Sequence, residues 1–200
     1  MGDLTLKHFN VTNKSSEEIT TKICSAYAYK DHILVNRINS KDNYEKCSMY
    51  SIINPLTSRE ISLGKMNYCM IEDNKLYCES EESIYIFNDK TNRLQKIDNG
   101  TIIKVKDNTV YYVNNNSAMK YEEGKKIVLY KNTDEYKIRS FEEYGNVLII
   151  YTRKDVYAVV DGKRVASIKE ATKNVETGAK VQMKDGRVKT FNEIDFSTYE

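Results

Sequence analysis

The chain has 200 residues, of which 40% are hydrophobic and 30% charged, a composition typical of a soluble globular protein and a length that suits one all-β domain. Its 31 basic and 29 acidic residues are mixed along the sequence, which argues against nucleic-acid binding because such binders usually show a basic excess. There is no apolar leader segment and no run of about 18 apolar residues, so we expect a cytoplasmic protein that makes no contact with membranes.

The first strand is predicted at residues 3–9, where apolar and polar side chains alternate. The polar residues 13–18 that follow have two interpretations: a short helix with a serine cap, or a loop that leads into the next strand. Tyrosine is abundant, with 16 residues against 5 phenylalanines, and favours strands because aromatic side chains pack across neighbouring strands.

Tight-turn signals then recur along the chain. Each contains Asn, Asp or Gly, which tolerate the positive φ of a two-residue hairpin turn. The marker residues of these turns are Asp31, Asp73, Asp107, Gly145 and Asp185. Their spacings are 42, 34, 38 and 40 residues, which is the length of one four-stranded propeller blade.

Three interior units share the same internal register. In each, one strand precedes the marker and a second follows it, a third lies 12 residues past the marker, and a fourth lies 21 residues past it. The residues at the 12-residue offset are Tyr85, Met119 and Tyr157, and those at the 21-residue offset are Leu94, Val128 and Ala166. The repeating unit is therefore predicted to contain four strands.

The first unit carries an insertion at residues 39–45, and the last unit stops after three strands. Because the strand at residues 3–9 can supply the missing one, we predict one domain over residues 1–200: an all-β, five-bladed β-propeller of four-stranded antiparallel blades, closed by the N-terminal strand pairing with the last blade. Deleting residues 1–10 is then expected to destabilise the whole fold. An ordinary β-sandwich or irregular barrel is the alternative. The predicted blades span residues 19–64, 65–99, 100–133, 134–169, and 175–200 plus 1–10.

Residues 48–59, with the sequence SMYSIINPLTSR, resemble a kelch-type pattern in which a tyrosine-bearing strand runs into an Asn/Asp-Pro-x-Thr turn. Residues 83–93 repeat this shape without the proline, and residues 111–116 are similar to bacterial propeller blades that read Tyr-Tyr-x-Asn. The Gly-Gly doublet and tryptophan of a true kelch blade are absent, as are WD40 signatures. The resemblance implies a propeller of unassigned subfamily, a fold that mostly serves as a protein-binding platform and sometimes houses an enzyme.

The four cysteines, Cys24, Cys47, Cys69 and Cys78, include no C-x-x-C pair, and only two histidines are present. We therefore expect no metal site and no cofactor. The cysteines are interpreted as small buried hydrophobic residues, with a Cys24–Cys47 or Cys69–Cys78 bridge as the alternative. No P-loop, GxGxxG, GxSxG or HExxH motif occurs, so no catalytic residue is predicted.

Recognition is expected on the loops that join the fourth strand to the next first strand and the second strand to the third. These loops are predicted at residues 39–46, 64–67, 79–82, 98–100, 114–117, 132–135, 152–154 and 169–174. The insertion is the most distinctive of them, either as a partner-contacting loop anchored by Tyr44 or as an idle surface segment. The candidate binding residues on this face are Tyr44, Lys41, Asp42, Asn67, Asn99, Asn115 and Arg153.

Two functions are compatible with these features. The first is a non-enzymatic module that binds a protein partner as a scaffold or inhibitor. The second is a small-ligand-binding or hydrolytic propeller that uses the mouth of a central channel, with channel candidates Tyr27, Tyr68, Lys104 and Arg139. A composition rich in Asn, Lys, Ile and Tyr suggests an AT-rich genome, such as that of a virus or phage, and hence a host-interaction factor.

Overall fold

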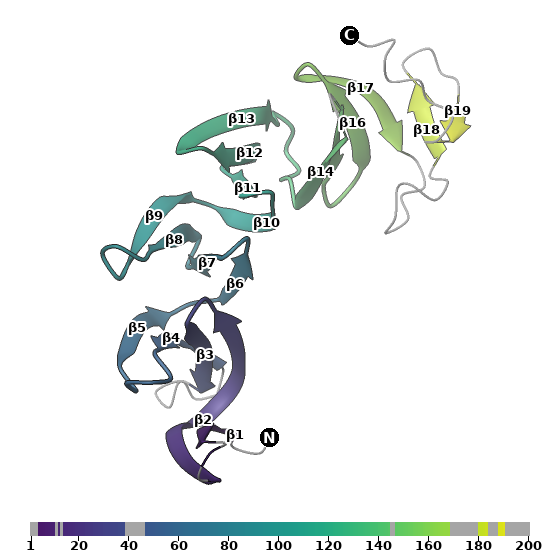
Figure 1. Cartoon of the computed structure of the whole chain (residues 1–200). Helices are drawn as coiled ribbons and strands as arrows, with labels where there is room; N and C mark the ends of the chain where they lie inside the picture. The colour runs from purple at the N-terminus through teal and green to yellow at the C-terminus, as the bar shows by residue number, and fades with distance from the viewer. Residues whose placement is uncertain are drawn as a thin grey trace. The chain divides into compact units, whose positions relative to one another are not determined.

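The computed structural model describes residues 4–10, 12, 14–38, 47–144, 147–168, 180–183 and 188–190. Within them the strands form four antiparallel sheets (Figure 1), and the all-β class is confirmed. The chain divides into two compact units, Met1–Asn99 and Gly100–Glu200, which are described in turn. No helix with the length and apolar character needed to span a membrane occurs in the described part of the chain.

The first unit begins with a five-stranded sheet in the order β1-β2-β3-β4-β5. Residues 15–18 form the start of a strand, so neither the helix nor the loop expected at residues 13–18 is present there. The strands are β1 (Leu4–Asn10), β2 (Ser15–Tyr29), β3 (His32–Ile38), β4 (Cys47–Ile53) and β5 (Glu60–Lys65).

β1 pairs with the first half of β2, where Leu6 faces Thr20, and the second half of β2 pairs with β3. A β-bulge at Lys22, which has φ 55°, separates the two halves and allows the strand to curve, as Figure 1 shows. The predicted closure, in which the N-terminal strand pairs with the last blade, is therefore wrong. Alternation of side chains identified the strand, but the strand beside it in sequence is its hydrogen-bonding partner.

The second sheet has the order β6-β7-β8-β9 and is joined by short turns. The predicted turn between β6 and β7 is confirmed, because Asp73 and Asn74 have φ 47° and 57°, as a two-residue hairpin turn requires. Glu81 and Glu82 adopt the same positive φ between β7 and β8, where the sequence contains no Asn or Gly. The strands are β6 (Tyr68–Glu72), β7 (Lys75–Ser80), β8 (Ser83–Asn88) and β9 (Arg93–Asn99).

The two sheets of the first unit share one hydrophobic core. Leu34 and Ile52 of the first sheet pack in it with Leu76 of the second, and each is at most 1% exposed. At the margin of this core, the hydroxyl of Tyr29 donates a 2.8 Å hydrogen bond to Asp89, which links the β2–β3 turn to the β8–β9 turn. The burial of apolar side chains therefore holds the two sheets together, and the hydrogen bond between Tyr29 and Asp89 links them at one end.

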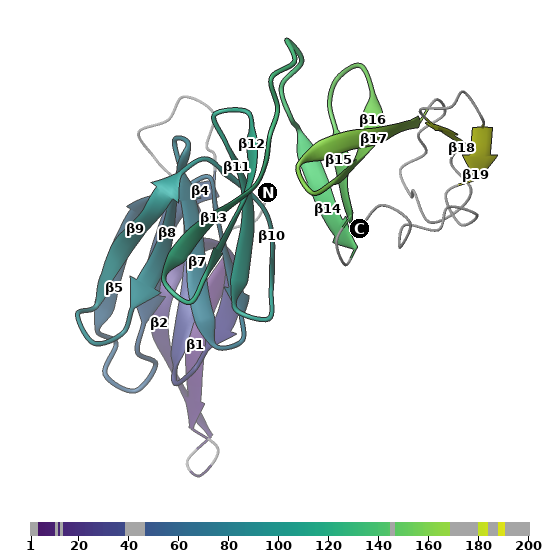
Figure 2. The same cartoon turned by 90° about the horizontal axis from the view of Figure 1, so that it is seen from above.

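The second unit contains a four-stranded sheet, β10-β11-β12-β13, and a six-stranded sheet that runs from β14 to β19. Figure 2 shows β14, β15, β16 and β17 side by side in one twisted sheet. The strands are β10 (Thr101–Lys106), β11 (Thr109–Asn114), β12 (Ser117–Glu122), β13 (Lys125–Lys131), β14 (Ser140–Tyr144), β15 (Val147–Tyr151), β16 (Val156–Val160), β17 (Lys163–Ile168), β18 (Lys180–Met183) and β19 (Val188–Thr190).

The core of the second unit lies between these two sheets. Phe141, Ile150 and Tyr157 of the six-stranded sheet are at most 1% exposed and pack with Ala118 of β12. Ile138, on the connection between β13 and β14, packs in the same cluster. The connection is thus anchored at an apolar point by Ile138, while residues 133–137 are exposed.

The predicted register of the three interior units is confirmed strand by strand. Tyr85, Met119 and Tyr157 lie on β8, β12 and β16, which are equivalent strands of three sheets. The five-bladed closed ring is wrong, because the structure has four separate antiparallel sheets and none is closed into a ring. β18 does not start a fifth sheet, because its Val181 pairs with Ile168 of β17 and so extends the fourth sheet.

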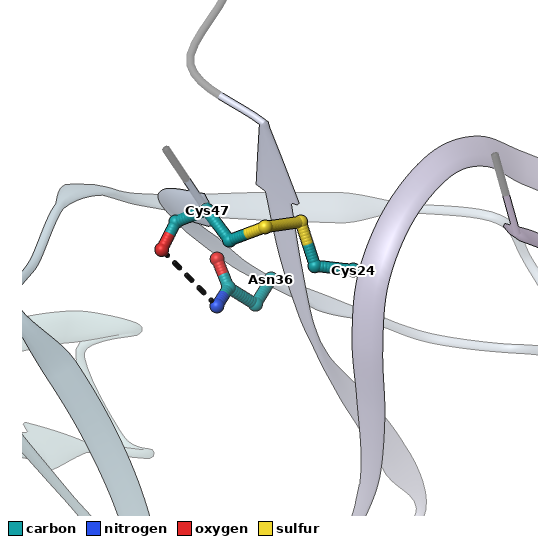
Figure 3. The surroundings of a disulfide bond; sticks show 3 residues. All are labelled: Cys24, Asn36 and Cys47. Atoms are coloured by element: carbon teal, nitrogen blue, oxygen red, sulfur yellow. Dashed lines mark hydrogen bonds between the residues drawn. A yellow bond between two sulfur atoms is a disulfide. The ribbon is translucent and has the colours of Figure 1, made fainter. Parts of the chain in front are cut away.

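All four cysteines are in disulfide bonds, which corrects their interpretation as free buried thiols. Cys24 on β2 is bonded to Cys47 at the start of β4, and Asn36 of the strand between them donates a hydrogen bond to the Cys47 carbonyl at 3.4 Å (Figure 3). Cys69 and Cys78 face each other across β6 and β7. Each bond lies within one sheet, so the disulfides stabilise individual sheets.

Candidate functional site

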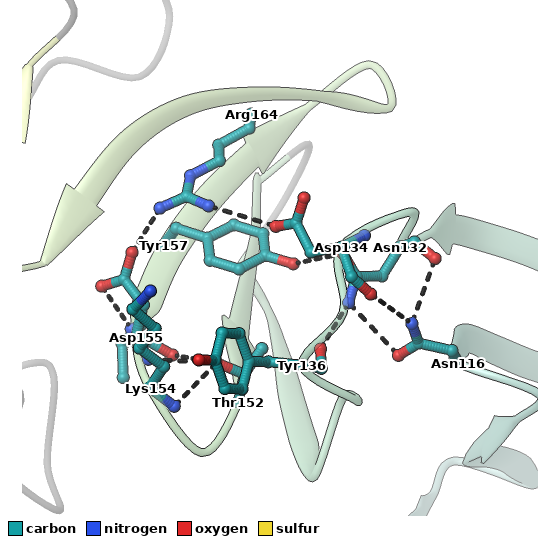
Figure 4. Close-up of polar contacts among 10 residues, drawn as sticks. Asn116, Asn132, Asp134, Tyr136, Thr152, Lys154, Asp155, Tyr157 and Arg164 are labelled. Atoms are coloured by element: carbon teal, nitrogen blue, oxygen red, sulfur yellow. Dashed lines mark hydrogen bonds and ion pairs between the residues drawn. The ribbon is translucent and has the colours of Figure 1, made fainter.

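A pocket of about 410 Å³ lies in the second unit, between the β13–β14 connection and the β15–β16 turn. Both of these loops are among those expected to carry recognition, and the structure places Asp134 and Glu135 of one and Thr152 and Lys154 of the other around one cavity. Arg164 of β17 completes the wall (Figure 4). The lining residues are Asp134, Glu135, Tyr136, Thr152, Lys154, Asp155, Tyr157 and Arg164.

Thr152 shapes the β15–β16 turn. Its hydroxyl oxygen accepts hydrogen bonds from the backbone N–H groups of Lys154 and Asp155, at 3.2 and 3.0 Å, and donates one to the Asp155 carbonyl. A threonine side chain can stabilise a turn in this way because its hydroxyl reaches the backbone a few residues further along. The turn therefore presents Lys154 outward and Asp155 toward the pocket.

Two asparagines fix the β13–β14 connection. The Asn132 side chain, which is 5% exposed, donates hydrogen bonds to Asn116 and to the Tyr136 carbonyl, and it accepts one from the Asp134 N–H group. Asn116, in the β11–β12 turn, accepts a 2.8 Å hydrogen bond from the Ile138 N–H group. These bonds satisfy backbone groups that the connection leaves without strand partners, so the loop is held in one conformation.

Arg164 occupies the back of the pocket. Its guanidinium group stacks over the Tyr157 ring at 4.1 Å, bonds to Asp155 on one side and lies 3.4 Å from Asp134 on the other. Burial raises the pKa of the Tyr157 hydroxyl above its ordinary value, with a further contribution from its hydrogen bond to Tyr130. Arg164 therefore has a structural role, and the charge of its guanidinium group is balanced by Asp134 and Asp155.

The outer groups of the pocket are differently placed. Glu135 is exposed, and no hydrogen bond or ion pair from another described residue engages its carboxylate. Tyr136 is 36% exposed, and the ammonium group of Lys154 lies 4.9 Å from the centre of its ring. The charged side chains of the inner wall are thus ion-paired with one another. The outer edge of the pocket consists of one carboxylate, one aromatic ring and one ammonium group.

The arrangement is suited to binding. It offers an aromatic surface and charged groups on loops that hydrogen bonds hold in place, which lowers the entropic cost of association. Its carboxylates do not converge with histidine or cysteine, and no group of three or more His, Cys, Asp or Glu side chains that could hold a metal ion is found in the described ranges.

The predicted loop-face residues that the structure describes are divided between the two units. Asn67 hydrogen-bonds to Glu79 through its backbone N–H, Asn99 accepts a hydrogen bond from Ser83, and both are in the first unit. Asn115 is an exposed turn residue beside Asn116, and Arg153 is exposed on the β15–β16 turn but does not line the pocket. Lys41, Asp42 and Tyr44 lie outside the described residues.

The channel candidates are divided between the two units, and their shared role stays a prediction. Tyr27 is 55% exposed on β2, and Tyr68 on β6 hydrogen-bonds to Glu79, which with burial raises the pKa of its hydroxyl. In the second unit the Lys104 ammonium lies 4.9 Å from the Tyr111 ring centre, and Arg139 is exposed beside β14. The closed ring around which the channel was predicted is not formed by the sheets of the described residues.

Sequence reasoning missed half of the residues in the pocket wall. It identified two loops but not Tyr136, Asp155, Tyr157 or Arg164. The β15–β16 turn has a recognisable local signal: a threonine whose hydroxyl can bind the backbone N–H groups two and three residues further along. The approach of Arg164 from a strand has no such signal, because it depends on how β16 and β17 pair.

No family model matches the chain, and no curated protein matches it in sequence. Two structures of Hsv2 from Kluyveromyces lactis, which is a β-propeller, are similar in fold. One has 10% identity and a TM-score of 0.52, with 94% of this chain and 69% of that chain covered. The other, with its loop 6CD complete, has 9% identity and a TM-score of 0.52, with 98% and 70% covered.

A third similar structure is the extracellular domain of a hybrid two-component system from B. thetaiotaomicron, at 12% identity and a TM-score of 0.49, with 84% of this chain and 27% of that chain covered. The likeness to Hsv2 and the four-stranded antiparallel units together show a β-propeller-type fold. The kelch-type resemblance seen in the sequence stays a prediction.

Proposed function

We propose that this chain is a non-enzymatic protein-binding module of the β-propeller type, and that the pocket between residues 132–136 and 152–155 is a contact site for its partner. The observation that carries the proposal is the exposed Tyr136, held at the rim of a cavity by a loop whose backbone is fixed through Asn132 and Asn116. Tyrosine is enriched at protein interfaces because it combines a large apolar ring with a hydroxyl group and has few rotatable bonds.

The shape of the site favours a partner that is itself a macromolecule. Asp134, Glu135, Tyr136 and Lys154 are all exposed, so the pocket is open to solvent along its rim and does not enclose a ligand. An open site of this kind can receive a side chain of a partner, and loops on rigid sheets are common positions for such contacts. The remaining affinity would come from neighbouring loop surface.

The form of binding proposed is scaffolding or inhibition. The chain's Asn-, Lys-, Ile- and Tyr-rich composition supports a source with an AT-rich genome, and a host protein is then the proposed partner. The alternative of a small-ligand or hydrolytic site relied on a channel through a closed ring. It is not retained, because the sheets do not close.

Photo-crosslinking tests the proposal. The photoreactive residue p-benzoylphenylalanine is placed at Tyr136 in one variant and at Tyr27 in a control, since Tyr27 is also an exposed tyrosine but lies in the other unit. In extracts of the source cells, the Tyr136 variant should form a discrete crosslinked protein product that the control does not form. Identical products from both positions, or none from Tyr136, would contradict the proposed contact site.

A further inference from the structure

The Tyr136 ring already has a cation against it. The Lys154 ammonium lies 4.9 Å from the ring centre, a distance at which the negative face of the ring attracts a positive charge. Both side chains are exposed, and no carboxylate of the described residues forms an ion pair with Lys154. Among the described residues, the Tyr136 ring is therefore the contact that holds the ammonium group, and the lysine can leave it at small cost.

The charges around the pocket favour a cation over an anion. Three carboxylates, from Asp134, Glu135 and Asp155, line it together with two cations, Lys154 and Arg164. Arg164 is paired with two of those carboxylates, and its guanidinium group faces the Tyr157 ring. If Lys154 moves away, the groups left at the rim are a carboxylate without a partner among the described residues and a vacant aromatic face.

From this arrangement, and resting on the function proposed above, we infer that the pocket accepts a basic side chain of the partner, preferably arginine, which takes the place of Lys154 on the Tyr136 ring and pairs with Glu135. Arginine suits both contacts because its planar guanidinium group stacks on aromatic rings and binds a carboxylate through two parallel hydrogen bonds. Lys154 then acts as an internal competitor that occupies the site when no partner is bound.

The competing idea is an acidic partner that binds Lys154 directly. The two ideas make opposite predictions for one substitution. Lys154→Gln removes the competitor and should tighten binding of a basic side chain, whereas it should abolish binding of an acidic one. Glu135→Gln should have the reverse effect, because it removes the carboxylate that a basic side chain needs.

The test is a titration of the ¹⁵N-labelled full chain with two blocked tripeptides, acetyl-Gly-Arg-Gly-amide and acetyl-Gly-Glu-Gly-amide, followed by NMR amide shifts. The arginine peptide should shift signals of residues 134–136 and 152–155 with a Kd in the millimolar range, as expected for a single side chain. Lys154→Gln should tighten this binding about threefold, and Glu135→Gln should weaken it about fivefold or more.

Matched controls separate local contacts from net charge. Lys163→Gln changes the charge as Lys154→Gln does, on an exposed residue outside the pocket, and Glu123→Gln matches Glu135→Gln on an exposed turn. Neither control should change the Kd more than about 1.5-fold at physiological ionic strength. Unchanged amide spectra away from the substituted residue would show that each variant is folded.

The outcomes distinguish this inference from the function on which it rests. Pocket shifts with the glutamate peptide only, lost in Lys154→Gln, would overturn the basic side chain but leave the pocket as a contact site. Binding of the arginine peptide that Lys154→Gln weakens would overturn the competitor role. Absence of pocket shifts with both peptides would overturn the inference, and photo-crosslinking at Tyr136 would then decide separately whether the contact site stands.

Discussion

Arg37 on β3 donates hydrogen bonds through both terminal nitrogens to the carboxylate of Glu60 on β5, the Nη2–Oε2 distance being 3.1 Å. The same guanidinium group also binds the hydroxyls of Thr20 on β2 and Ser51 on β4, at 2.8 and 3.1 Å. One side chain therefore connects four adjacent strands of the first sheet. Four predictions follow from this and three other contacts.

Replacing Arg37 with Met should destabilise the first sheet by about 1–2 kcal/mol, because the hydrogen bonds are lost while the aliphatic packing is kept. Arg37 lowers the pKa of Glu60 below its ordinary value, so this contribution is complete above pH 4.5 and disappears as the pH falls through the lower folded pKa. Urea unfolding at pH 7 and pH 3 measures it. Glu60→Gln should differ from the parent more at pH 7 than at pH 3, and an equal difference at both would contradict the assignment.

The Cys24–Cys47 bond closes a segment with a sequence separation of 23 residues, which in the chain-entropy model is worth about 3 kcal/mol. A Cys24→Ala, Cys47→Ala double variant should therefore unfold at clearly lower urea concentration than the parent under oxidising conditions. Full reduction should bring the parent to the level of a variant lacking all four cysteines. Mass spectrometry of disulfide-linked proteolytic fragments from the unreduced parent checks the pairing, and two alkylated thiols in the unreduced parent would contradict it.

Gly100 is tightly confined between β9 and β10. Its φ is +133°, and a Cβ atom there would lie 2.4 Å from the Val113 carbonyl oxygen. Gly100→Ala should cost about 3 kcal/mol or more, since a backbone atom cannot move aside as a side chain can. Gly124 is the control: its φ is +82° but nothing lies within 4 Å of the added atom, so Gly124→Ala should cost about 1 kcal/mol. Similar losses for both variants in thermal unfolding would argue against the close approach.

Asn132 makes four side-chain hydrogen bonds near the pocket, one of them from the hydroxyl of buried Tyr157 at 3.2 Å. Asn132→Ala should cost about 2–3 kcal/mol, because it leaves buried polar groups without partners. Asn99→Ala, on an exposed residue, should stay within about 0.5 kcal/mol of the parent. The free energy of unfolding in urea gives both values, and faster amide exchange at residues 134–138 should accompany the first. Normal exchange there would show that Asn132 does not hold the loop.

Turn chemistry and side-chain periodicity were sufficient to predict most strands. Asp73-Asn74 and Asp107-Asn108 form the expected turns because Asn and Asp adopt positive φ readily. The turn at Glu81-Glu82 could not be predicted from its residues, since its positive φ is imposed by the pairing of β7 with β8. Local residue preferences therefore predict where the strands lie. A turn that departs from these preferences is determined by the pairing of the strands on either side of it.

Partners of strands were harder to predict than the strands themselves. The alternation at residues 4–10 indicates which side chains share a face, but it carries no information about which strand lies alongside, so β1 was assigned to the wrong sheet. The residues that line the pocket were difficult to predict for the same reason. Its two loops were expected, whereas Arg164 reaches Asp155 only because β17 pairs beside β16.

In every sheet the structure describes, each strand pairs only with strands next to it in sequence, from β1-β2 to β18-β19. No pairing has to wait for a distant segment of the polypeptide. Chains with short loop closures fold quickly for β-proteins, because little entropy is lost before contacts form. Each sheet can therefore assemble as soon as its last strand leaves the ribosome, and synthesis and folding of this protein can proceed together from the N-terminus.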